Sequence, residues 1–70
     1  MTLEEIKGLN KEWISVKEMA SFLDCDPQVL RMQAIEDRES IDFLGPLTIR
    51  RHTKFWKPAV IAHFERLINA

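Results

Sequence analysis

The stretch that decides the fold of this chain is residues 15–34, which read SVKEMASFLDCDPQVLRMQA. It holds two helix starts. Ser15 and Glu18 have the capping-box spacing, in which the hydroxyl accepts from a first-turn amide and the carboxylate accepts from the amide of the cap residue. Asp26 followed by Pro27 is the second start, because aspartate caps helices well and the proline ring suits the first helical position. These signals predict short helices near residues 16–23 and 27–36.

The apolar residues agree with this interpretation. One stripe at helical spacing runs along the first helix and consists of Val16, Met19, Ala20 and Leu23. Leu30 and Ala34 are expected on the buried side of the second helix, with Val29 and Met32 as a second, weaker stripe that would rotate the helix by one residue. Only the turn Asp24-Cys25-Asp26 separates the two helices, so together they form a helix-turn-helix. The second helix of such a unit often lies in the major groove of DNA.

A small hairpin is expected after the break at Gly45-Pro46. In residues 47–50, leucine and isoleucine alternate with polar residues, as in a half-buried strand. Residues 51–53 are typical of a turn, and residues 54–57 of a returning strand. The hairpin near 47–57 therefore has a basic tip, and it needs to pack against helices to be stable.

A final helix is predicted near residues 58–68, beginning at Pro58. Its apolar residues have the clearest amphipathic pattern in the chain and are Val60, Ile61, Phe64, Leu67 and Ile68. The fold class is therefore mostly α with a small β-hairpin, in the order helix, turn, helix, hairpin, helix. We expect one domain over residues 1–70, with 1–12 as a loosely ordered N-terminal arm. The side chains expected in the core are Leu23, Leu30, Ile49, Phe64 and Leu67.

Length and composition exclude several classes of protein. Seventy residues allow one domain with a small core, and a hydrophobic fraction of 46% is too high for a disordered chain. No segment approaches the roughly 20 apolar residues of a membrane span. The acidic N-terminus lacks the apolar run of a signal peptide. Cys25 is the only cysteine, so no internal disulfide is expected, and a cytoplasmic location is the simplest inference.

No metal, cofactor or catalytic centre is expected either. Cys25, His52 and His63 lack the paired spacing of zinc ligands. The chain has no glycine-rich loop for phosphate binding. A domain of this size also leaves little room for a substrate cleft. The sequence therefore predicts a protein that is not an enzyme and that takes no small-molecule substrate.

The charge distribution is more informative than the net charge of −1. That net charge is not typical of a nucleic-acid-binding protein. Residues 46–58, however, contain four basic residues and no acidic one: Arg50, Arg51, Lys54 and Lys57. A local basic patch can contact phosphates while the whole molecule stays near neutral. The alternative is a solvated hairpin whose charges protect a sheet edge.

The ordered set of motifs resembles a known family. The matching residues are Trp13 to Ala20 for the entry and first helix, Pro27, Leu30, Arg31 and Ala34 for the second, residues 47–50 with Lys54-Phe55 for the hairpin, and Pro58 with Phe64 for the last helix. Over about residues 13–68, the chain resembles winged helix-turn-helix domains of the excisionase and MerR-like kind. The similarity is strongest to small excisionases of conjugative transposons and phages. The chain departs from that family at Met32, where a second basic residue is common, and at Gln33, where leucine is common.

The resemblance implies sequence-selective binding of double-stranded DNA. The second helix would enter the major groove with its base-reading residues, Gln28, Arg31 and Met32. The hairpin would act as a wing, and the contacts to the DNA backbone would come from Lys17, Arg50, Arg51, His52 and Lys54. The implied role is an excisionase-type recombination directionality factor, or a small regulator of a mobile element or phage. Further partners would be an integrase or recombinase, or neighbouring copies of the protein on DNA, in the cytoplasm of a bacterium.

The alternative function is protein binding. A winged helix that has lost its DNA role can dock another protein through exposed aromatic residues and methionine. Trp56, Phe55 and Met32 are the candidates here. The salt dependence of duplex binding discriminates between the two functions, because only phosphate contacts give a steep dependence.

Overall fold

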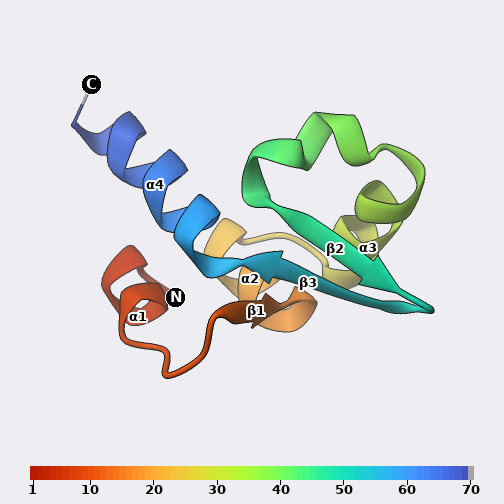
Figure 1. Cartoon of the computed structure of the whole chain (residues 1–70), viewed down its shortest axis with the longest axis horizontal. Coiled ribbons are helices and arrows are strands. Elements are labelled where there is room, and N and C mark those ends of the chain that lie inside the picture. The colour runs from red at the N-terminus through yellow and green to blue at the C-terminus, as the bar shows by residue number, and fades with distance from the viewer. Residues whose placement is uncertain (70) are drawn as a thin grey trace.

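The helices begin where the local capping signals place them. A computed structural model describes residues 1–69. The elements in chain order are α1 (Leu3–Lys7), β1 (Trp13–Ser15), α2 (Val16–Leu23), α3 (Pro27–Glu36), the 3-10 helix η1 (Arg38–Leu44), β2 (Pro46–Ile49), β3 (His52–Trp56) and α4 (Lys57–Ile68). Figure 1 shows their arrangement. The chain is mostly helical with a small antiparallel sheet, as the sequence predicts. No helix within residues 1–69 is long and apolar enough to cross a membrane.

Both predicted caps are present. The amide of Glu18 donates to Ser15 Oγ at 3.1 Å, and the amide of Ser15 donates to Glu18 Oε1 at 3.1 Å. The amide of Gln28 donates to Asp26 Oδ1 at 2.8 Å, and Pro27 is the first residue of α3. Asp24 ends α2 in the left-handed conformation. The predicted bounds of α2 and α3 and the short turn between them are therefore confirmed.

The sheet has three strands in the order β1-β3-β2, and both pairings are antiparallel. The sequence predicts the hairpin but not β1, because three residues are too few to show alternation. The predicted turn at residues 51–53 is also displaced. His52 and Thr53 pair with Ile49 and Thr48, so the turn consists of Arg50 and Arg51. Arg50 adopts the left-handed conformation there, with φ 61°.

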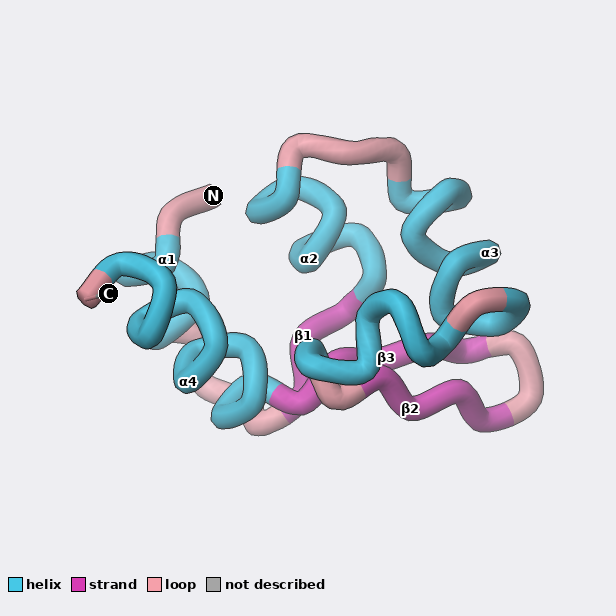
Figure 2. Tube along the Cα trace, turned by 90° about the horizontal axis from the view of Figure 1, so that it is seen from above, coloured by secondary structure: helices cyan, strands magenta, loops and turns pink. Residues whose placement is uncertain are grey.

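One face of the sheet packs on the helices. Ile14 and Phe55 are neighbours on this inner face, and both are fully buried. Helices α2 and α3 lie to this side of the strands (Figure 2). The rest of the core comes from every other element except β2 and consists of Ile6, Val16, Met19, Ala20, Leu30, Ala34, Ile41, Leu44 and Val60. Leu23 and Phe64 are half-buried and pack against this core.

Two residues expected in the core are exposed. Ile49 is 61% exposed because it pairs with His52 on the outer face of the sheet, opposite to the face that carries Phe55. The prediction assumed that the apolar residues of β2 faced inward, but Pro46 occupies the inner face next to Phe55. Leu67 is 58% exposed because it lies in the last turn of α4, which extends beyond the other elements (Figure 1).

The N-terminal residues are part of the fold rather than a loosely ordered arm. Ile6 is fully buried, and Lys7 Nζ lies 2.7 Å from Glu65 Oε1 on α4. This hydrogen bond with Glu65 raises the pKa of Lys7 above its ordinary value. The amide of Lys57 donates to the carbonyl of Glu12 at 2.8 Å, and Lys57 Nζ donates to the carbonyl of Leu9. These contacts hold α1 and the following loop against the start and end of α4.

Gly45 joins η1 to the hairpin in a conformation that requires glycine. Its φ is 64°, which side chains with a Cβ rarely adopt. A Cβ on Gly45 would also lie 2.9 Å from the Cβ of Trp56. The carbonyl of Gly45 accepts from the amide of Trp56 at 3.1 Å. The break at Gly45-Pro46 therefore positions β2 beside β3.

We predict that Phe55→Ala lowers the free energy of unfolding by about 3–5 kcal/mol, because it removes a fully buried aromatic ring from the centre of the sheet. A loss of this size would unfold much of a domain with so small a core. Phe43→Ala is the matched control, because Phe43 is 46% exposed and stacks only on the surface against His63. It should cost about 1 kcal/mol. Equal losses in urea unfolding would contradict this account of the core.

Candidate nucleic-acid interface

A basic groove lies between β3, the start of α2, and α3. Its volume is about 550 Å³. It is lined by five lysine and arginine side chains, one histidine and a single carboxylate: Lys11, Lys17, Arg31, Arg51, Lys54, His52 and Glu12. The remaining lining residues are Trp13, Ser15, Val16 and Thr53. We call this set the basic groove.

The unequal lengths of β1 and β3 create the basic groove. Strand β1 pairs only with residues 54–56 of β3, and its last residue, Ser15, is the cap of α2. The chain therefore turns away into α2, and His52 and Thr53 continue beyond β1 toward the hairpin tip. Lys17 comes from the first turn of α2, and Arg31 comes from α3. Three separate elements thus direct cations into one concavity.

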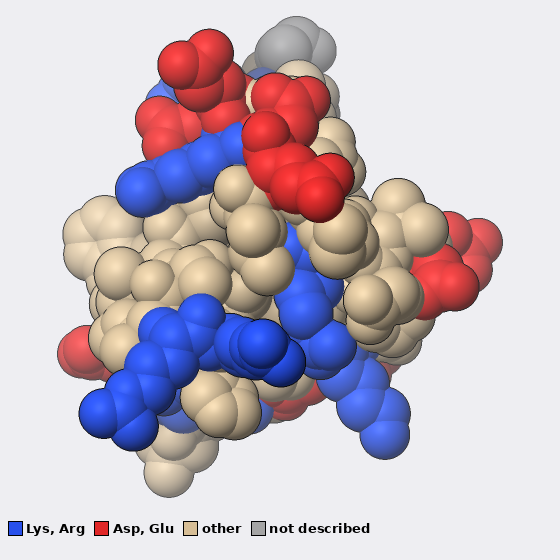
Figure 3. All heavy atoms as spheres, turned by 90° about the vertical axis from the view of Figure 1, so that its right-hand side faces the viewer, with Lys and Arg blue, Asp and Glu red and all other residues tan. Residues whose placement is uncertain are grey.

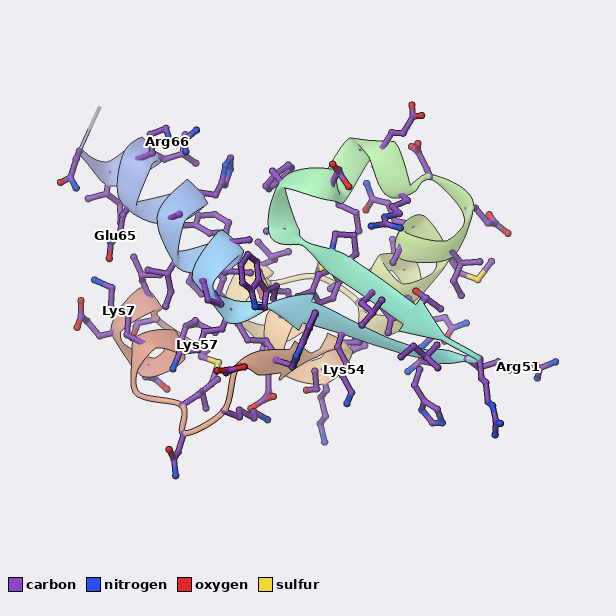
Figure 4. All side chains as sticks on the ribbon, in the orientation of Figure 1. Lys7, Arg51, Lys54, Lys57, Glu65 and Arg66 are labelled. Atoms are coloured by element: carbon purple, nitrogen blue, oxygen red, sulfur yellow. The ribbon has the colours of Figure 1, made fainter. Side chains whose placement is uncertain are left out.

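Lysine and arginine side chains gather at the hairpin end of the molecule. Figure 3 views this end and shows them across the middle and lower part of the surface, with the larger acidic groups near the upper and right margins. Figure 4 shows Arg51 at the far end of the hairpin, whereas Lys7 and Glu65 approach each other at the opposite end of the molecule. Basic side chains therefore gather at the hairpin end although the net charge is −1.

Four cations of the basic groove have no ion-pair partner within residues 1–69: Lys17, Arg31, Arg51 and Lys54. All four are exposed. Outside the basic groove, Lys7 pairs with Glu65 and Arg38 with Asp42. Arg50, Lys57 and Arg66 form no ion pair within residues 1–69. Because the four unpaired cations share one concave surface, their combined field attracts an external polyanion.

Lys11 differs from the other groove cations because it pairs with Glu18 of the capping box. Burial raises the pKa of Glu18, but the hydrogen bonds from Lys11 and Ser15 outweigh burial and hold that pKa below its ordinary value. Lys11 therefore connects the rim of the basic groove to the start of α2. Its charge is largely compensated by Glu18.

The structure brings together five of the eight residues that sequence reasoning assigned to DNA contact. Lys17, Arg31, Arg51, His52 and Lys54 all line the basic groove. Gln28, Met32 and Arg50 do not. Gln28 lies on the exposed side of α3, where its Oε1 accepts from Arg31 Nη1 at 3.3 Å. Arg50 lines a second hollow on the outer face of the hairpin.

Lys11, Glu12 and Trp13 were missed by sequence reasoning. They line the basic groove because β1 brings the residues before α2 next to β3. The available signal was the basic and aromatic run just before the capping box at Ser15. Without β1, nothing in the sequence connected that run to the hairpin.

The outer surface of α3 is apolar rather than basic. Val29, Met32 and Ile35 are 60%, 40% and 51% exposed, and they follow one another at helical spacing. Arg31 is the only basic residue of this helix. The helix therefore presents one cation and a three-residue apolar stripe to solvent.

Comparison with known proteins identifies no relative. No protein-family model, curated protein or solved structure gives a significant match to this chain. Within residues 1–69, no three His, Cys, Asp or Glu side chains are grouped so that they could hold a metal ion. Cys25 is exposed in the turn between α2 and α3. The basic groove is therefore the candidate site that the chemistry of the described surface supports best.

We predict that Glu18→Gln lowers the free energy of unfolding at pH 7 by about 1 kcal/mol, because it weakens the capping box and removes the ion pair with Lys11. Since the pKa of Glu18 is lowered in the folded state, its contribution is full above the ordinary value of 4.5 and is lost as the pH falls below it. The difference between wild type and variant should shrink accordingly in urea unfolding at a series of pH values. Glu36→Gln, at an exposed carboxylate, is the control. A constant difference down to pH 3 would contradict the assignment.

Proposed function

We propose that this protein binds double-stranded DNA sequence-selectively through the basic groove. In this proposal α2 and α3 act as a helix-turn-helix, and β2 and β3 act as a wing. The observation that carries the proposal is the convergence of four unpaired cations from α2, α3 and the hairpin on one concave surface. A duplex presents phosphates on both sides of a groove, which matches cations on both sides of a concavity.

Arg31 is the residue best placed to read bases. It is the one cation of α3, and a helix of this kind fits the major groove. An arginine can donate to both O6 and N7 of guanine. Its hydrogen bond with Gln28 brings a second base-reading side chain, suited to adenine, to the same turn of the helix. Met32 and its apolar neighbours would contact thymine methyl groups.

Lys17, Arg51 and Lys54 would hold the phosphate backbone. Three such contacts give a slope of about −2.7 in a plot of log binding constant against log salt concentration, whereas strong binders make about 6–10 phosphate contacts. We therefore infer a modest intrinsic affinity. Neighbouring copies on DNA or a recombinase partner would raise the effective affinity by linking several weak contacts.

A small DNA-binding domain with modest affinity suits an accessory role on DNA. We propose an excisionase-type recombination directionality factor, or a small regulator of a mobile element or phage, acting in the bacterial cytoplasm. Support for this part comes from the motifs quoted in the sequence analysis and from the two caps and the hairpin that those motifs predicted. An integrase or recombinase is the corresponding protein partner.

A protein-binding module is the second candidate, and the apolar stripe of α3 is the observation that favours it. Val29, Met32 and Ile35 form a surface suited to a partner protein. Phe55, which the sequence analysis named as a docking residue, is fully buried and is excluded from such a surface. In this case duplex affinity would be weak and nearly independent of sequence.

We predict that Arg31→Ala costs about 1–3 kcal/mol of binding free energy on a preferred duplex and relaxes selectivity at the contacted base pair. The physical reason is that base edges carry sequence information and phosphates do not. Fluorescence anisotropy with preferred and scrambled duplexes measures both effects. Arg66→Ala on α4 is the control, because Arg66 is exposed and lies far from the basic groove (Figure 4). If wild-type protein does not distinguish the duplexes, sequence-selective binding is wrong.

We predict that Arg51→Ala weakens binding to all duplexes alike and reduces the salt slope by about one unit. Arg51 lies at the hairpin tip, and in this proposal it contacts the phosphate backbone rather than a base. Titrations at several salt concentrations measure the slope. Independently, amide shifts of residues 27–33 and 50–55 should move when duplex is added at low salt. Unmoved shifts at millimolar DNA would favour the protein-binding module.

A further inference from the structure

The outer face of the sheet is a second surface, distinct from the apolar stripe of α3. Side chains on β1, β3 and β2 that alternate with the buried ones point to this face: Trp13, Ser15, Leu47, Ile49, His52, Lys54 and Trp56. Trp56 is 46% exposed, and Ile49 is 61% exposed. Helices α2 and α3 lie on the opposite side of the sheet, whose face holds the buried Phe55. We call this set the outer sheet face.

The outer sheet face combines aromatic, aliphatic and cationic groups. Trp13 and Trp56 are directly opposite each other in the pairing of β1 with β3, so both side chains extend from the same face. A hollow of about 590 Å³ lies beside them and is lined by Leu47, Ile49, Arg50, His52 and Lys54. No carboxylate lines this hollow. Lys54 and His52 also line the basic groove, so the two surfaces are continuous.

We propose that the outer sheet face binds single-stranded DNA. Bases would stack on Trp56 and Trp13, and phosphates would contact Arg50 and Lys54. Single-strand binding proteins combine these two elements, a positive surface that follows the backbone and aromatic rings that stack with unpaired bases. Leu47 and Ile49 beside the indoles offer apolar contact to the methyl group of thymine.

Two features favour single-stranded DNA over other occupants. A duplex buries its base faces in the stack, so exposed indoles on a sheet gain nothing from it, whereas unpaired bases expose the faces that stack. The 2′-hydroxyl of RNA can both donate and accept a hydrogen bond, and it donates most strongly to a carboxylate. The outer sheet face has no carboxylate or amide side chain, and the hydroxyl of Ser15 already accepts from the amide of Glu18. Thymine-rich DNA is therefore the expected ligand.

The experiment uses the intrinsic fluorescence of the wild-type chain. Its two tryptophans both lie on the outer sheet face, so stacking should quench the fluorescence directly. The probe is an oligothymidylate of about eight nucleotides, within the range that one small binding surface covers. Quenching should saturate at low salt. Two phosphate contacts should give a salt slope of about −1.4.

Variants locate the site, with affinity measured by the anisotropy of labelled oligothymidylate. Trp56→Ala should weaken binding by about tenfold or more, because it removes one stacked base contact. Trp56→Phe should retain most of the affinity, because phenylalanine keeps an aromatic ring at this position. Retained affinity would show that a substitution at position 56 leaves the site folded. Phe43→Ala is the matched control, because Phe43 is also 46% exposed but lies on η1. Its affinity should equal that of wild type.

Single-strand binding can be distinguished experimentally from duplex binding. Arg31→Ala, which should impair duplex binding, should leave oligothymidylate affinity unchanged, because Arg31 does not line the hollow beside the tryptophans. Absence of quenching at low salt would overturn the proposal. So would an equal loss in Phe43→Ala, or tighter binding of an oligouridylate of the same length. Failure of duplex binding alone would leave the single-strand result intact.

Discussion

The burial of Phe55 in the central strand is the constraint on which the rest of the structure depends. Phe55 has Ile14 on one side and Pro46 on the other, and its ring is fully enclosed by the core. Because side chains alternate along a strand, burial of Phe55 also turns Thr53 inward and turns His52, Lys54 and Trp56 outward. The hydroxyl of the buried Thr53 forms a hydrogen bond with the hydroxyl of Thr48 at 3.0 Å. A shift of one residue would place Lys54 in the core, so the register is strongly fixed.

This register also positions the candidate site. Pairing of Trp13 to Ser15 with β3 places the cap of α2 beside the sheet, and α2 then sets the position of α3. The basic groove is the space left where β1 ends and β3 continues. Its cations come from segments far apart in sequence, and of these segments only the hairpin is strongly basic. A slightly acidic chain can therefore present a basic surface, because its carboxylates are distributed elsewhere.

Two chemically different surfaces meet along β3. The basic groove faces the helices and has cations on opposing sides, which suits a polyanion with an extended charged surface. The outer sheet face has two indoles and aliphatic side chains with cations at its edge. Four residues belong to both surfaces: Trp13, Ser15, His52 and Lys54. Ligands of the two surfaces would therefore influence each other through shared cations rather than through a change of fold.

The sequence by itself determined the features that depend on neighbouring residues. The two caps, the bounds of α2 and α3, and the glycine-proline break all rest on local hydrogen bonds or backbone preferences. The cations Lys17, Arg31, Arg51 and Lys54 were named through the resemblance to excisionases, and all four line the basic groove. The burial of Leu30 and Ala34 followed from their spacing on one helix.

Only the tertiary structure decided which face of the hairpin is buried. Leu47 and Ile49 have the alternation of an inward-facing set, but Pro46 and Phe55 occupy that face, so both aliphatic side chains point outward. Strand β1 and the packing of Ile6 likewise depend on distant partners, β3 and α4. Lys11 and Trp13 line the basic groove because β1 pairs with β3, and the sequence did not predict β1. Which distant strands pair depends on which of their side chains are buried together in the core. The residues of one segment alone therefore do not predict the pairing.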